Sequence, residues 1–330
     1  MIFEMVKDNK TAPLELWYRR IATISVGAVL FLILVGGIVR STGSGMGCPD
    51  WPKCFGLFVP PTQVDEIPQS FFESHPQFES KTFNAFQTWI EYVNRLVGAT
   101  IGLLMFLTAV LSLSFVRKDK RVFLLSLAAM LLTGFEAWLG KLVVDKNLEG
   151  GMVTIHLLVA MVIVALLILA NYLVGRRIYP EATEVKKVPK QLVWLGLAVI
   201  VMTVFQILIG TKVRESVDIV AQQVGMSQRS EWLQGSLSYS IHKIGWLVMA
   251  GLVAVWIRSV LNHFSSHPMM KRLSIGLIVA IAAEIVFGLV LANFDLPAAV
   301  QPLHMLFANL IFAAEFAIWI HLVGKSRDNG

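Results

Sequence analysis

Three of the seven histidines fall in segments that are otherwise almost entirely apolar: His156, His242 and His304. A polar ring in such surroundings needs a hydrogen-bond partner or a metal. Neutral imidazole is a good ligand for iron, and two imidazoles that face one another commonly hold a six-coordinate haem. The residue types therefore point to haem-iron chemistry, with interhelical hydrogen bonding by each histidine as the alternative.

The residues around these histidines recur along the chain. An offset of 148 residues maps one set onto another without a gap: Asn94, Glu136, Gly140 and His156 onto His242, Glu284, Gly288 and His304. The same offset relates Arg95 to Lys243, and an offset of 174 relates Arg40 to Arg214. Duplication of this kind predicts two similar bundles related by an axis along the membrane normal, with any site inside a bundle.

The two halves differ at one of these positions. His242 and His304 both lie in the second half and form the natural pair of axial ligands. The corresponding pair in the first half is Asn94 and His156, and asparagine is a poor iron ligand. We therefore expect the first half to hold a porphyrin by one histidine, with an open axial face that suits a substrate.

Carboxylates and cations accompany the histidines. Glu91 lies about one helical turn before Asn94, on the same face, where it could act as an acid or base or stabilise developing positive charge. An interfacial glutamate that reaches water is the alternative. Hydrogen bonds in helix packing are the simplest role for Glu136 and Glu284. Four cations near the same membrane face could pair with haem propionates or serve as ordinary interfacial anchors: Arg40, Arg95, Arg214 and Lys243.

The elements that must position these residues are membrane-spanning helices. The chain has 330 residues, of which 56% are hydrophobic and 15% charged, against about 25% charged in soluble domains. Eight apolar runs are near the roughly 20 residues that cross a bilayer. They are Ile21–Val39, Asn94–Val116, Val122–Val144, Met152–Val174, Leu192–Ile209, Tyr239–Trp256, Leu273–Asn293 and Leu303–Val323. The predicted fold is an all-α integral membrane protein with two four-helix bundles, residues 1–185 and 186–330.

The orientation follows from lysine and arginine. One set of connections, together with both termini, holds 18 of the 28 basic residues, which places the termini in the cytoplasm. The net charge of +6 then reflects membrane topology and does not indicate nucleic-acid binding. The first apolar run lacks a small-residue cleavage site and is not interpreted as a signal peptide. The three histidines fall toward the outer side.

The only two cysteines, Cys48 and Cys54, fall in the predicted outer loop, residues 40–90. That compartment permits disulfides, which favours a Cys48–Cys54 bond over two free thiols.

The segment from Gly36 to Cys54, which reads GGIVRSTGSGMGCPDWPKC, resembles the signature that follows the first helix of haem A synthases. The Glu91-Tyr92-x-x-Arg95 motif and the three helix-borne histidines also match, and the resemblance covers nearly the whole chain. Two features depart from the family pattern. The usual Glu-x-x-His of the second helix ends here in Asn94, and the second cysteine pair of some members is absent.

The resemblance implies a membrane oxidoreductase that converts haem O to haem A for terminal oxidases, by two hydroxylations of the C8 methyl group. It implies a haem b cofactor bound by His242 and His304, substrate haem at His156, catalysis by Glu91, and a Cys48–Cys54 disulfide. Expected partners are lipid, an electron acceptor, the haem O supplier and a second copy of the chain. The alternatives are a di-haem b-type electron carrier and a haem transporter or chaperone.

Overall fold

The computed structural model describes residues 13–76, 78, 83–145, 150–178, 188–224, 235–264 and 267–328. Eight helices in this part of the chain are long and apolar enough to cross a membrane, which confirms the predicted all-α membrane fold. They are α1 (Pro13–Ser41), α3 (Ala85–Ser112), α4 (Lys120–Asp145), α5 (Gly150–Ile178), α6 (Lys190–Val224), α8 (Leu237–His263), α9 (Pro268–Asn293) and α10 (Val300–Asp328).

The helices are longer than the predicted spans, because a helix satisfies its own backbone hydrogen bonds and need not end where the apolar stretch ends. The longest helix, α6, contains 35 residues and carries Arg214 well beyond the predicted end at Ile209. In the second span, α3 begins at Ala85, where the side chain of Asn84 accepts a hydrogen bond from the Gln87 backbone N–H. Glu91 therefore lies inside a helix and not at its start.

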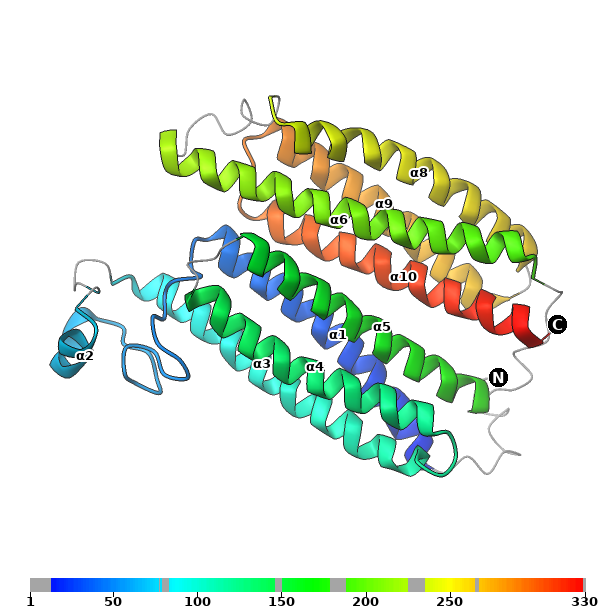
Figure 1. Cartoon of the computed structure of the whole chain (residues 1–330), viewed down its shortest axis with the longest axis horizontal. Helices are drawn as coiled ribbons and strands as arrows, with labels where there is room; N and C mark the ends of the chain where they lie inside the picture. The colour runs from blue at the N-terminus through cyan, green and yellow to red at the C-terminus, as the bar shows by residue number, and fades with distance from the viewer. Residues whose placement is uncertain are drawn as a thin grey trace.

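The helices form two groups of four. In the first group α1, α3, α4 and α5 pack in a ring, each on its two neighbours, and α6, α8, α9 and α10 repeat this arrangement. Figure 1 shows the two groups side by side, with α1 and α5 of the first against α10 and α6 of the second. A buried apolar cluster that includes Ile33, Leu167 and Phe312 spans the contact between the groups. The predicted boundary between residues 185 and 186 lies outside the described residues.

The loop between α1 and α3 projects from one end of the molecule, opposite the end where α1 begins and α10 ends (Figure 1). It contains the 3-10 turn Val64–Glu66 and the short helix α2, Gln69–Ser74. Aromatic rings form its core: Phe55 packs edge-on against Phe71 and Phe83, with centroids 5.4 Å apart in both pairs. The loop is thus a packed element that can hold the residues at its base in place.

Candidate haem site

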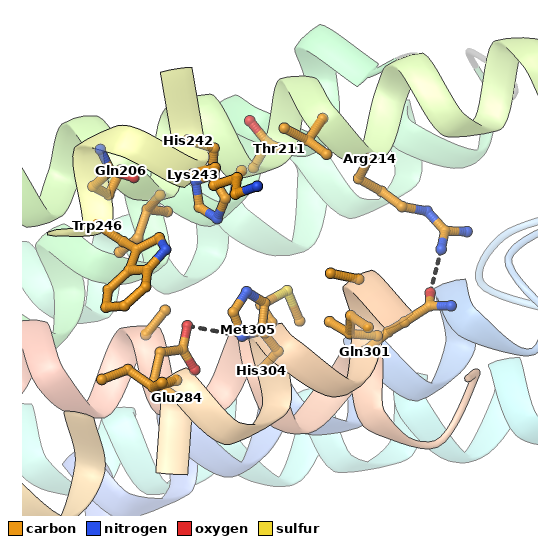
Figure 2. A pocket seen from close by; sticks show the side chains of 18 of the residues that line it. Gln206, Thr211, Arg214, His242, Lys243, Trp246, Glu284, Gln301, His304 and Met305 are labelled. Atoms are coloured by element: carbon orange, nitrogen blue, oxygen red, sulfur yellow. Dashed lines mark hydrogen bonds and ion pairs between the residues drawn. The ribbon is translucent and has the colours of Figure 1, made fainter. Parts of the chain in front are cut away.

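A cavity of about 900 Å³ lies inside the second group of helices. Residues of α6, α8, α9 and α10 line it, and Gly37 and Arg40 of α1 close one side. Ligand pockets commonly have volumes of roughly 300–1,000 Å³, so this cavity can hold a large ligand. Most of its lining is apolar, with a few polar groups that could orient what it binds (Figure 2).

Two histidines face one another across this cavity. His242 projects from α8 and His304 from α10, and their ring centroids are 6.4 Å apart (Figure 2). Two imidazoles on opposite sides of one metal, each with a nitrogen about 2 Å from it, have centroids about 6 Å apart. The spacing of the two rings therefore fits a bis-histidine metal group such as haem. The structure brings together the two residues that the sequence predicted as a ligand pair.

In each half, a glutamate carboxylate lies at the Nδ1 atom of a histidine. Glu284 Oε1 lies 3.1 Å from Nδ1 of His304, and Glu136 Oε2 lies 2.6 Å from Nδ1 of His156. A carboxylate at Nδ1 fixes the ring orientation and leaves Nε2 for a metal. The sequence interpretation favoured hydrogen bonds in helix packing for these glutamates, and each does contact a neighbouring helix, but it did not identify the histidine as the partner. The signal that could have shown it was the recurrence of Glu and His together at one spacing.

Glycines leave room for the two facing rings. A Cβ atom at Gly288 would lie 3.4 Å from Cε1 of His304, and one at Gly210 would lie 3.4 Å from Cε1 of His242. A Cβ atom at this distance would lie at the close limit of ordinary van der Waals contact, so a side chain larger than alanine would push the ring. The glycines thus help to set the positions of both rings.

The site in the first half is more open. The side chain of His156 is 40% exposed, against 26% for His304. Asn94 stands on α3, across the first bundle from α5, and its Oδ1 atom is buried without a hydrogen bond to any described residue. Asn94 and His156 thus lie on opposite helices of the first bundle, as His242 and His304 do in the second.

Glu91 and Arg95 connect α3 to the outer loop. The carboxylate of Glu91, which is 3% exposed, accepts a hydrogen bond of 2.8 Å from the Cys48 backbone N–H and forms an ion pair with Arg95. The guanidinium of Arg95 also donates to the carbonyl oxygens of Cys48, Asp50 and Lys53. Both side chains hold the loop, and neither Glu91 nor Arg95 is among the residues that line the cavity of the second group.

Arg40 and Arg214 share one carboxylate. The Asp218 side chain lies 3.0 Å from Arg40 and 2.8 Å from Arg214, so one aspartate joins repeat-related arginines of the two halves. Arg214 also donates to Gln301 (Figure 2). Both arginines line the cavity, as does the exposed Lys243, so all three would lie near a ligand bound there. The sequence interpretation missed Asp218, although its position four residues after Arg214 on a helix was a usable signal.

The structure pairs Cys48 with Cys54, with Cα atoms 4.8 Å apart. The pair lies buried beside the start of α3, where the Thr88 hydroxyl donates to the Gly47 carbonyl.

Fold and site together define an integral membrane protein of two four-helix bundles, one of which encloses a ligand cavity faced by two histidines. A family model described as cytochrome oxidase assembly protein (COX15-CtaA) matches residues 19–316. The chain therefore belongs to this family.

Named relatives agree with the family. The chain is 32% identical to the heme A synthase of Shewanella oneidensis over 197 residues, which cover 59% of this chain and 55% of the relative. It is 26% identical to the heme A synthase of Ehrlichia canis over 88% of each chain. It is 23% identical to that of Rickettsia felis over 92% of this chain and 96% of the relative.

Proposed function

We propose that this protein is a haem A synthase, which oxidises the C8 methyl group of haem O to the formyl group of haem A. The observation that carries the proposal is the difference between the two halves. One half presents a facing pair of histidines, and the other presents one histidine with its carboxylate and an asparagine. The heme A synthase names of the relatives supply the chemistry.

The reaction balances as a four-electron oxidation. Two successive hydroxylations give a geminal diol, which loses water to leave the formyl group. In total, the methyl group and one water yield the formyl group, four protons and four electrons. The electrons pass to an acceptor outside the chain.

Each predicted residue has a part in this proposal. Haem b, held between His242 and His304, supplies one-electron chemistry when bound. Arg40, Arg214 and Lys243 at the cavity would neutralise its propionates, and Arg95 would act through the loop that it holds. His156 would bind the substrate haem, with Asn94 on the helix across the first bundle. Glu91 would be the catalytic carboxylate.

The placement in the cell is also part of the proposal. Both termini lie on the cytoplasmic side of a bacterial membrane, and the haem sites lie toward the outer side. The partners are haem O, lipid, the enzyme that supplies haem O, an electron acceptor and a second copy of the chain.

The alternatives are less well supported. A di-haem electron carrier needs a histidine pair in each bundle, and Asn94 takes the place of one of them. A haem transporter or chaperone needs a porphyrin site but no acid or base, so the buried Glu91 counts mildly against it.

The decisive experiment is haem extraction from protein purified from cells that also make haem O, followed by chromatography with mass detection. We expect haem b together with haem A or its hydroxylated precursor. Haem b alone, with haem O present in the cells, would contradict the proposal and favour a cytochrome or carrier.

A further inference from the structure

The middle of α10 contains a buried carboxyl group that plays no part in the proposed ligand sets. Glu315 has no exposed surface, and neither of its oxygens forms a hydrogen bond with a residue in the described part of the chain. An ionisable group buried in a membrane helix is costly and usually has a function. The corresponding residue of the first half, 148 positions earlier, is Leu167, which is equally buried. Glu315 therefore belongs specifically to the half with the facing histidines.

Polar side chains connect Glu315 to the cavity. Its carboxyl group faces Thr203 of α6, and Thr203, Gln206 and Asn309 all line the cavity. The amide of Gln206 and the Oδ1 atom of Asn309 are buried and make no hydrogen bond within the described residues. Buried polar groups with this much unused capacity commonly bind water. A polar connection thus leads from the cavity to Glu315 through an otherwise apolar core.

The surroundings of Glu315 contain few other groups that could exchange protons. Helices α1, α5, α6 and α9 pack against α10. Between the charged residues near their ends, the sequences of α1 and α6 contain no ionisable residue, and that of α9 contains Glu284, which contacts His304. Before the arginines in its last turn, α5 contains His156, which contacts Glu136, and Tyr172, which packs on His321 of α10 with ring centroids 4.6 Å apart. Among these helices, Glu315 is therefore the carboxyl group that could change its protonation with the charge of a group in the cavity and that does not contact a proposed haem ligand.

We infer that Glu315 takes up a proton when haem b in the cavity is reduced, an inference that rests on the proposed function. One electron converts ferric to ferrous iron, and one proton from water bonds to a carboxylate oxygen, so that no net charge enters the core. The extra positive charge of the ferric site favours the carboxylate, and its loss favours the neutral acid. The electron comes from oxidation of the substrate methyl group, and in the experiment it comes from an electrode.

The test is a spectroelectrochemical titration of haem b in the purified full-length protein at several pH values. Coupling of one proton to one electron lowers the midpoint potential by up to about 59 mV per pH unit, which is a tenfold change in proton activity converted for a one-electron couple. We expect a clear slope in the wild type and less than half of it in Glu315→Gln. The control is Glu15→Gln, which removes another buried carboxyl group, paired with Lys118 at 2.7 Å in the first half.

An equal slope in wild type and Glu315→Gln would overturn the inference, as would a wild-type potential that does not change with pH, a result that needs no variant. Infrared spectroscopy gives a second readout that needs no haem. In the reduced or haem-free protein, the carbonyl band of a neutral carboxylic acid must be present in the wild type and weaker in Glu315→Gln, and an unchanged band would also overturn the inference. Absence of low-spin haem b from the protein would instead contradict the proposed function, and the infrared result would still decide the state of Glu315.

Discussion

The two bundles have the same arrangement of helices and differ at the residues where a ligand would bind. Each places a histidine on its last helix with a glutamate at Nδ1, and each places the corresponding partner on the helix across the bundle. That partner is His242 in the second bundle and Asn94 in the first. The second bundle encloses a cavity around its pair, whereas the histidine of the first is more exposed.

This difference shows how a duplicated bundle can serve two purposes. Under the proposed function, the two histidines of the second bundle would hold a haem that stays with the protein. The single histidine of the first bundle would hold a porphyrin that can react and leave. The contact of Glu136 with His156 repeats that of Glu284 with His304, so the first bundle keeps the histidine and its carboxylate although it lacks the second histidine.

Exchange of the residue that differs between the two bundles should have the largest effect. His242→Asn makes the second bundle resemble the first and should abolish the low-spin b-type absorption spectrum. Activity should fall by about 100-fold or more, since even an indirect partner of a metal ligand is worth about 10–100-fold. An unchanged spectrum would show that His242 is not a ligand.

The reverse exchange is the matched control. Asn94→His gives the first bundle a second histidine, and we expect an additional low-spin haem signal and product that remains bound to the protein. Haem content and single-turnover product release measure both effects. Faster release in this variant would contradict the role given to the open axial face.

Glu91→Gln tests which function the buried carboxylate serves. Glutamine can still accept the hydrogen bond from Cys48 but loses the charge that pairs with Arg95. As the proposed acid or base, Glu91 should contribute about 100-fold or more to turnover, with the haem b spectrum unchanged. Product analysis measures this.

Alkylation without reductant supplies the control for Glu91→Gln. Cys48 and Cys54 should remain unreactive in wild type and variant alike, which shows that the loop is intact. Normal turnover in the variant would limit Glu91 to holding the loop. Free thiols in the wild type would contradict the disulfide.

Replacing the glutamates that contact the two histidines should have smaller effects, and the two replacements can be compared with each other. Glu284→Gln should weaken retention of haem b by about 10-fold, and Glu136→Gln should instead raise the concentration of haem O needed for half-maximal activity by about 10-fold. Haem b content and steady-state kinetics separate the two. The assignment of one ligand to each bundle would be wrong if both variants lost haem b equally.

The smallest expected effect concerns the contact between the bundles. Asp218→Asn removes the carboxylate shared by Arg40 and Arg214, and partly exposed ion pairs contribute about 0–1 kcal/mol each. We expect a small decrease in the midpoint of thermal unfolding in detergent. Glu215→Gln, which breaks a pair with Lys212 inside α6, is the control and should have less effect. Equal decreases would argue that Asp218 adds nothing to the joining of the bundles.

Much of this architecture could be read from local patterns. Hydropathy alone predicts eight spans, because a helix crossing a bilayer must bury about 20 apolar residues, and the structure has eight such helices. The two offsets identify His242, His304 and the exceptional Asn94, because duplicated helices keep their spacing. The helix ends were less predictable, since α6 continues past the apolar stretch to Val224, and hydropathy does not show where a helix ends outside the bilayer.

The sequence by itself determined the helices, their duplication and the residues able to bind a metal. Only the tertiary structure decided the partners of those residues: the carboxylates of Glu284 and Glu136 at histidine rings, Asp218 between two arginines, and Arg95 turned to the loop. The physical reason is that hydropathy and spacing are properties along one segment. A contact between side chains depends on the rotation and axial register of two helices, and packing across the whole bundle sets both.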